Sequence, residues 1–278
     1  MKKTQPIFFL SAGRSGSYQI FDYFQNSEFV ESHHEHLFDE TLKSTVSYRM
    51  GKLDLSDLKD FFATKYGKSI LNCKKDIWID SSNALPWGLD AMVDCFPNAK
   101  FIHLIRDGRK VVSSFFNKFQ DEMYPLSGIN QLQYWIENYN STAPDPDKRI
   151  WRPIPNIQKD KIAFKEDKSN RFAMLCWYWA ELNNEINDFT KDLPPDQFYF
   201  LKFENFISNS SERDQLLDFM ELDDISILSK DLSKPLNVAK PINFNFSINQ
   251  SEIFNLICAS TNSKFGYDGK REIYDVKY

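Results

Sequence analysis

The chain has 278 residues, which is enough for one large domain with a well-buried core, and nothing in its composition calls for a second domain. Its 34 Lys and Arg against 39 Asp and Glu give a net charge of −5, which excludes the overall basic field that gathers nucleic acid or anionic membranes. We therefore expect no nucleic-acid partner, and any affinity for anions has to be local.

The apolar segments indicate neither a membrane span nor a secretory signal, and the cysteines indicate a reducing compartment. No stretch approaches the roughly 20 apolar residues of a membrane span, and the apolar run of residues 7–10 is too short for a secretory signal before Arg14 interrupts it. We expect a cytoplasmic protein without a membrane span. Four widely spaced cysteines, without a C-x-x-C pair, are read as buried free thiols; they are Cys73, Cys95, Cys176 and Cys258.

The first predicted strand, residues 6–10, leads into the run Ser-Ala-Gly-Arg-Ser-Gly-Ser at positions 11–17. The apolar residues of positions 18–24 then recur at helical spacing. The sequence therefore predicts a strand, a tight loop and the start of a helix.

The residue types of this loop suit an anion. Gly13 and Gly16 allow backbone conformations in which successive N–H groups converge on one oxyanion. Arg14 and Ser17 add a charge and a hydroxyl beside the positive end of the helix dipole. The loop differs from the G-x-x-x-x-G-K-[ST] P-loop of nucleoside triphosphatases, because its spacing is shorter and no Lys precedes Ser17. A P-loop kinase of a small metabolite stays an alternative, as does a plain Gly/Ser turn.

Strands and helices alternate in the prediction for the next part of the chain. Short strands are predicted at residues 28–31 and 78–80, and helices at residues 56–62 and 86–96. Such alternation implies a mostly parallel sheet flanked by helices, a three-layer α/β fold.

A second motif follows the predicted strand of residues 100–105, which is apolar and ends at Arg-Asp-Gly-Arg, positions 106–109. Ligands of open α/β sheets bind beyond the carboxyl ends of the strands. Ser114 lies eight positions after Arg106, within a predicted helix. The two side chains are candidates for holding a second phosphate. The alternative is an ion pair between Arg106 and Asp107, with Ser114 as an ordinary surface serine.

The remaining sequence contains an irregular segment and then further regular elements. Residues 120–170 are polar and rich in Pro, and we favour an acceptor-binding lid over a surface excursion without a ligand. Beyond them, a helix is predicted at residues 171–189, a strand at 198–203 and helices at 212–222 and 251–259.

Together the two motifs resemble those of sulfotransferases that use 3′-phosphoadenosine 5′-phosphosulfate (PAPS) as the donor. In that family an R-S-G-[ST] loop binds the 5′-phosphosulfate, and an R-D-G-R element with a serine eight residues after its first Arg binds the 3′-phosphate. The resemblance implies that Arg106 and Ser114 hold the 3′-phosphate. It also implies a phosphosulfate site made by Gly13, Arg14, Ser15, Gly16, Ser17 and Tyr18.

The resemblance extends from about residue 7 to about residue 267 and implies one sulfotransferase domain over residues 1–278, with a P-loop-like α/β fold. It implies in-line transfer of a sulfuryl group from PAPS to a hydroxyl or amine, with 3′-phosphoadenosine 5′-phosphate (PAP) as the product and no metal. Carbohydrate, lipid, peptide and small-metabolite acceptors all remain open, and so does the oligomeric state.

The transfer requires a general base. In the carbohydrate and tyrosyl-protein branches of the family, a Glu roughly 20 residues after the motif Arg has this role, and Glu35 stands 21 residues after Arg14. Glu35 and Arg14 are therefore our first choice of catalytic residues. Small-molecule branches use a His, which keeps His34 and His36 open as the base, with His33 the weakest candidate.

One departure from the family pattern concerns a Lys that supports the sulfuryl group in many relatives. The corresponding positions 80–83 read Asp-Ser-Ser-Asn, so we expect hydrogen bonds only, with Lys74 or Lys75 as weak substitutes. A third hypothesis, beside the sulfotransferase and the metabolite kinase, is therefore a family member that binds the nucleotide without catalysis. Zinc is not expected, because no acidic or Cys cluster accompanies the histidines.

Overall fold

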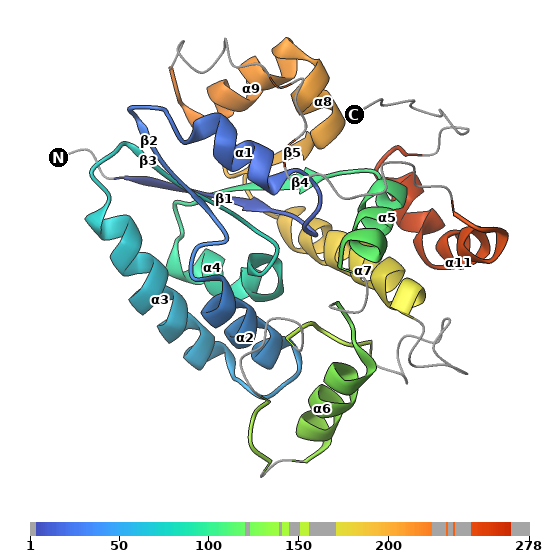
Figure 1. Ribbon diagram of the computed structural model, residues 1–278. Helices are drawn as coiled ribbons and strands as arrows, with labels where there is room; N and C mark the ends of the chain where they lie inside the picture. Colours follow the sequence, from blue (N-terminus) through green and yellow to red (C-terminus); the bar gives the residue numbers. More distant parts are fainter. Residues whose placement is uncertain are drawn as a thin grey trace. The chain divides into compact units, whose positions relative to one another are not determined.

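The structure is a computed structural model (Figure 1), in which the chain divides into two compact units. One unit comprises Met1–Arg106 and Glu185–Leu236, and the other comprises Asp107–Asn184 and Asn237–Tyr278. The structure describes residues 4–119, 123–138, 141–144, 151–155, 171–223, 232, 236 and 246–267. The single domain over residues 1–278 stays a prediction.

The first unit is built on a five-stranded sheet with the order β2-β3-β1-β4-β5, in which every neighbouring pair is parallel. Strands β1, β3 and β4 are almost entirely buried, as is typical of parallel strands covered on both faces. The chain leaves β1 toward one edge of the sheet and later crosses to the other, so the loop after β1 lies at the point where the strand order reverses. The strands are β1 (Gln5–Leu10), β2 (Val30–His34), β3 (Ile77–Ser82), β4 (Lys100–Ile105) and β5 (Phe198–Lys202).

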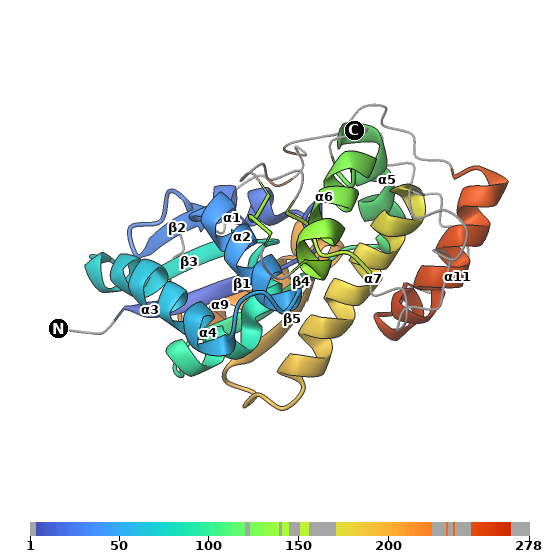
Figure 2. The same cartoon turned by 90° about the horizontal axis from the view of Figure 1, so that it is seen from below.

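Helices cover both faces of this sheet (Figure 1), which confirms the three-layer α/β prediction. On one face Phe9 and Ile102 join a core with Ile20 of α1 and Phe206 of α8. One layer contains α1 (Ser17–Phe24), α8 (Phe203–Ser208) and α9 (Ser210–Met220). The other, seen from below in Figure 2, contains α2 (Phe38–Arg49), α3 (Leu55–Asn72), the short 3-10 helix η1 (Leu85–Gly88) and α4 (Leu89–Cys95).

The second face of the sheet is packed with aromatic rings. Phe8 of β1 stacks on Phe101 of β4 with ring centres 5.7 Å apart, and it meets the edge of Trp78 of β3 at 5.8 Å. Tyr66 of α3 lies against both Phe8 and Trp78, at 6.3 and 5.9 Å. This packing fixes α3 on the sheet and, with it, the Tyr66 hydroxyl.

The second unit is helical in its described part. Its helices are α5 (Gly108–Phe119), α6 (Leu126–Glu137), most of α7 (Arg171–Thr190), which continues into the first unit, and α11 (Ile248–Lys264). The guanidinium of Arg171 donates hydrogen bonds of 2.9 to 3.1 Å to the carbonyls of Phe115, Phe116 and Met123, which joins α7 to the end of α5. Among the described helices, none combines the length and the apolar character needed to cross a membrane.

Helices α2 and α6 were not predicted, and several other elements have bounds that differ from the prediction; α3, for example, covers Leu55–Asn72 instead of residues 56–62. Helix α2 was not predicted, because its buried face includes Thr41 and Thr45 beside the apolar side chains. Helix α6 lies inside the segment expected to be irregular, and it begins directly after Pro125. Strand β2 begins at Val30 and extends through His34, because pairing with β3 supports polar residues that alone do not indicate a strand.

The cysteine prediction is confirmed in part. All four thiols are free, and three of them are buried, but Cys95 is only half-buried.

Candidate active site

The loop between β1 and α1 turns through a series of left-handed residues. Gly13, Arg14 and Gly16 have φ angles of 75°, 51° and 96°. The N–H of Gly13 bonds to the hydroxyl of Ser11 (3.3 Å), and the hydroxyl of Ser15 donates to the carbonyl of Gly13 (3.1 Å). The Ser15 hydroxyl therefore shapes the loop from within.

Gly16 is the residue at which the loop becomes a helix. It is the N-cap of α1, and no side chain caps this end of the helix. A Cβ at Gly16 would lie 2.1 Å from ring carbons of Phe203, the first residue of α8. Only glycine therefore fits between the loop and this ring. The uncapped N-terminus of α1 suits an anion, because its N–H groups can donate hydrogen bonds to one.

Two arginines meet at this loop. Nη1 of Arg106, at the end of β4, donates to the carbonyl of Arg14 (3.2 Å), and its guanidinium lies 5.0 Å from the ring centre of Phe203. Burial and the positive charge of Arg106 lower the pKa of Arg14 to about 10, against the opposing effect of Glu35. Two like charges held close together by half-buried side chains favour an anionic ligand, so these residues fit a phosphosulfate group.

His34 faces this loop from β2. Its Nε2 and the Ser17 hydroxyl share a hydrogen bond of 3.1 Å, and its ring meets the ring of Tyr18 at 5.4 Å. Tyr18 itself is 40% exposed. Burial, and after it the positive charge of Arg14, lower the pKa of His34 to about 4. The imidazole is therefore neutral at physiological pH and serves as the partner of Ser17.

The other two histidines of the segment lie elsewhere. His33 bonds to Glu31 (3.0 Å), and its ring packs on Trp78 at 4.9 Å. His36 packs on Trp78 and Tyr66, with ring centres 5.4 and 5.3 Å away. Because strand residues alternate between faces, His34 points toward α1 and His33 points to the opposite side.

Glu35 follows β2 and leaves the strand direction, with a φ angle of 58°. Its Oε1 accepts a hydrogen bond of 2.9 Å from Nδ2 of Asn83, which follows β3. Its N–H donates to the carbonyl of Ser81 (3.2 Å), whose hydroxyl donates to the carbonyl of Ser17 (2.9 Å). These bonds tie Glu35 to the first turn of α1.

Asn83 therefore contacts the candidate base from the segment where many relatives have a Lys. From the sequence alone, Asn83 was noted only as part of a segment that departs from the family pattern. Lys75 is no substitute for that Lys, because its Nζ donates to the carbonyls of Ser27 and Val30 (2.8 and 2.9 Å), at the amino ends of β2 and β3, whereas Glu35 and Asn83 follow their carboxyl ends.

The second motif continues into the second unit. Ser114 lies on α5 and is buried, in the helix that the sequence predicted. Nη2 of Arg109 lies 2.7 Å from a carboxylate oxygen of Asp107, and the N–H of Gly108 bonds to Oδ1 of Asn262 (3.3 Å). A joint role of Arg106 and Ser114 stays a prediction.

A comparison with protein families decides the class. The model of the sulfotransferase family matches residues 6–155, which include both motifs. The chain belongs to the sulfotransferase family. It is accordingly a sulfotransferase-family enzyme, as the motifs predicted.

Solved sulfotransferase structures share this fold. The sulfotransferase domain of the Synechococcus PCC 7002 olefin synthase is 17% identical, with a TM-score of 0.52 over 97% of this chain and 98% of that one. Sulfotransferase STF9 from Mycobacterium avium is 10% identical, with a TM-score of 0.57 over 96% of this chain and 78% of that one. A comparison with curated proteins finds no match.

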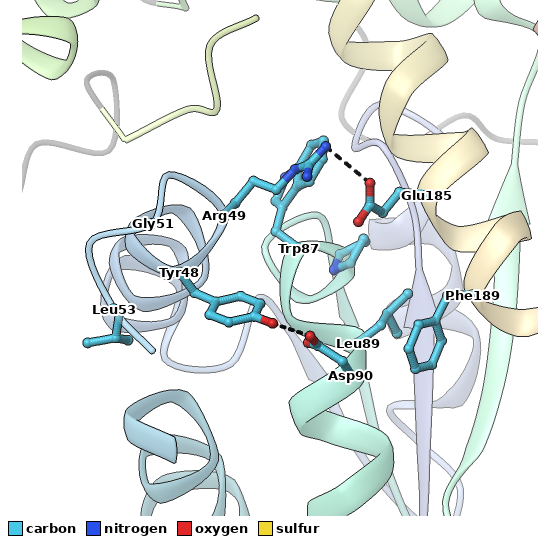
Figure 3. A pocket seen from close by; sticks show the side chains of 10 residues that line it. Tyr48, Arg49, Gly51, Leu53, Trp87, Leu89, Asp90, Glu185 and Phe189 are labelled. Carbon is cyan, nitrogen blue, oxygen red and sulfur yellow. Dashed lines mark hydrogen bonds and ion pairs between the residues drawn. The ribbon is translucent and has the colours of Figure 1, made fainter. Parts of the chain in front are cut away.

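A cavity of about 370 Å³ in the first unit lies at the far end of α2 (Figure 3). Its polar side chains pair with one another: Tyr48 bonds to Asp90, and Nη2 of Arg49 lies 3.2 Å from Glu185 while its guanidinium lies over Trp87. The 12 residues of α2 extend roughly 18 Å between this cavity and the segment of Glu35. The cavity is therefore separate from the loop between β1 and α1.

Asp80 of β3 is fully buried, and its carboxylate accepts a hydrogen bond from the N–H of His36, the residue after Glu35. Burial raises its pKa to about 7; the N–H of His36 opposes this shift and the charge of Glu35 adds to it. An unfolded Asp loses its proton near a pKa of about 4, so ionising Asp80 costs folding stability as the pH rises from about 4 to about 7.

We expect Asp80→Asn to remove this pH dependence. Between about pH 5 and pH 8 the wild type should lose about 2–3 kcal/mol of unfolding free energy relative to the variant. Urea unfolding at both pH values measures the difference. His34 and His36, whose lowered pKa values act in the opposite direction, are common to both proteins and cancel in the comparison. Parallel pH profiles would contradict the buried ionisation.

Proposed function

We propose that this enzyme transfers the sulfuryl group of PAPS to a hydroxyl or amine of an acceptor. The observation that carries the proposal is the meeting of Arg14 and Arg106 at a left-handed loop that opens onto the N-terminus of α1. This arrangement suits a donor with phosphate and sulfate groups. Glu35, tied to the same helix turn through Ser81 and held by Asn83, adds a carboxylate next to that loop.

In the proposed reaction the acceptor oxygen or nitrogen forms a bond to sulfur while the bond from sulfur to the 5′-phosphate oxygen breaks, and PAP leaves. Arg14 and the N-terminal N–H groups of α1 stabilise the negative charge that develops on the leaving phosphate. The Glu35 carboxylate takes the proton of the acceptor. Arg106 and Ser114 would hold the 3′-phosphate. No step requires a metal.

Glu35 is a better base than His34 for two reasons. The His34 ring already shares a hydrogen bond with Ser17. Its pKa of about 4 also makes it a weak acceptor of protons at neutral pH. We therefore assign His34 to orienting the Ser17 hydroxyl, and Glu35 to the proton transfer.

The two other hypotheses, a metabolite kinase and a binding protein without catalysis, have less support. A metabolite kinase of the P-loop type needs a loop Lys, and Arg14 and Ser15 stand directly before Gly16 and Ser17 instead. A binding protein without catalysis would need no oriented carboxylate, whereas Asn83 holds that of Glu35. We place the acceptor site in residues 120–170 and the enzyme in the cytoplasm, and we leave the class of acceptor open.

Thermal unfolding with nucleotides tests the donor site. We expect PAP to raise the melting temperature more than AMP or ATP with magnesium does, because a ligand at 100 times its Kd stabilises the folded state by about 2.7 kcal/mol. Arg106→Ala should abolish the gain, whereas Arg49→Ala, at the separate cavity, should keep it. Stabilisation by ATP with magnesium alone would instead support the kinase.

A further inference from the structure

The Asp80 carboxylate lies inside the sheet, yet it has no described ion-pair partner. Asp80 is 0% exposed and lies in β3, where it pairs with Phe8 of β1 on one side and with His33 of β2 on the other. A buried carboxylate is costly unless hydrogen bonds satisfy it. Its Oδ1 accepts a hydrogen bond of 3.0 Å from the N–H of His36, and its Oδ2 lies 3.4 Å from the hydroxyl of Tyr66.

The same Tyr66 hydroxyl holds the other side of His36. It donates to the His36 carbonyl at 2.7 Å, and the Thr41 hydroxyl lies 2.9 Å from it. Both main-chain polar groups of His36 are therefore bound by side chains, one from β3 and one from α3. The ring of Tyr66 is itself 0% exposed and packs against the rings of Phe62 and Trp78, which position its hydroxyl.

Glu35 is the residue directly before this held position. Its left-handed conformation costs roughly 1–2 kcal/mol for a residue with a side chain, and such strain persists only where the surrounding structure over-determines it. The N–H of Glu35 is bound to Ser81, and its carbonyl accepts from the N–H of Phe38 (3.1 Å). With the polar groups of His36 bound as well, hydrogen bonds hold the main chain at Glu35 and at the residue after it.

We propose that Asp80 and Tyr66 are positioning residues for catalysis, which hold the main chain at His36 and thereby orient the Glu35 carboxylate. The inference rests on the proposed role of Glu35 as the base. Asn83 holds the carboxylate itself, while Asp80 and Tyr66 hold the backbone that carries it. A catalytic group displaced by about 1 Å can lose about 10²-fold in rate, so this support matters beyond stability.

The test compares Asp80→Ala, Asp80→Asn and Tyr66→Phe with the wild type. Asn keeps an oxygen for the His36 N–H, and Phe keeps the ring but removes the hydroxyl. Three quantities are measured: amide hydrogen exchange of His36, stabilisation by PAP, and release of PAP from PAPS. The release assay contains N-acetylglucosamine, tyrosine methyl ester and octanol, and it counts transfer to any of them or to water.

We expect Asp80→Ala to speed exchange of the His36 amide about tenfold, the equivalent of one lost hydrogen bond. PAP release should fall about 10²-fold, while stabilisation by PAP stays at the wild-type level because the loop at residues 11–17 is untouched. Asp80→Asn should restore slow exchange and most of the release. Tyr66→Phe should lower release without changing stabilisation by PAP.

Asp80→Ala with wild-type exchange and wild-type release would overturn the inference. So would a loss of folding stability in Asp80→Ala with normal release per folded molecule, because that pattern belongs to a purely structural residue. The proposed function fails in a different way, namely when Glu35→Gln releases PAP at the wild-type rate. In the Glu35→Gln background, Asp80→Ala should have no further effect on release if it acts through Glu35.

Discussion

Glu35→Gln is expected to lower kcat for sulfuryl transfer from PAPS by about 10²- to 10⁴-fold, the usual contribution of a general base. Glutamine keeps an oxygen for the Nδ2 of Asn83 but cannot take the acceptor's proton. PAP binding should be unchanged or slightly tighter, because a negative charge near Arg14 is lost. Release of PAP and stabilisation by PAP together measure the two effects.

Glu31→Gln is the matched control for this variant. Glu31 lies four positions before Glu35, inside strand β2, and it bonds to His33, on the face away from α1. It should keep wild-type turnover. If Glu35→Gln kept full turnover while His34→Gln lost it, His34 would be the base and the present assignment would be wrong.

Gly16→Ala is expected to abolish stabilisation by PAP and to lower the unfolding free energy by about 2–5 kcal/mol. A left-handed conformation costs roughly 1–2 kcal/mol for alanine, and the new methyl would meet the Phe203 ring at 2.1 Å, where overpacking costs about 1–3 kcal/mol. Either the loop or α8 has to move, and with it the N–H groups that would face the donor. Urea unfolding and the PAP melting assay measure both consequences.

Gly51→Ala separates the two causes. Gly51 also has a positive φ angle, 72°, but no atom lies within 4 Å of the position of an added Cβ. This control should lose about 1–2 kcal/mol through backbone strain alone and should keep its response to PAP. Equal losses in both variants would mean that contact with Phe203 does not shape the loop.

The sequence predicted the two motifs well because each is a local pattern. An apolar strand followed by glycines and a helix can be recognised from about 20 consecutive residues, and β1, α1 and β4 were all confirmed. The Arg14 loop could therefore be placed without the structure. Glu35 was chosen for its distance along the chain from Arg14, and its role as the base stays a prediction.

What the sequence could not predict depends on contacts between distant residues. Asn83 and Glu35 are 48 positions apart, and neither residue type identifies the other as its partner. Phe203 covers Gly16 from helix α8, although the two residues are 187 positions apart in the sequence. His36 looked equivalent to His34 in the sequence, but its ring packs on Trp78 and Tyr66. Pairing of strands and packing of helices decide each of these cases.

Transfer of radiolabelled sulfuryl from PAPS tests the central claim most directly. The wild type and Glu35→Gln are incubated with labelled PAPS and the same three acceptors, and products are separated from the donor. We predict labelled product and stoichiometric PAP with the wild type, reduced by at least about 10²-fold in Glu35→Gln. Equal yields of labelled product from the wild type and from Glu35→Gln would contradict the account.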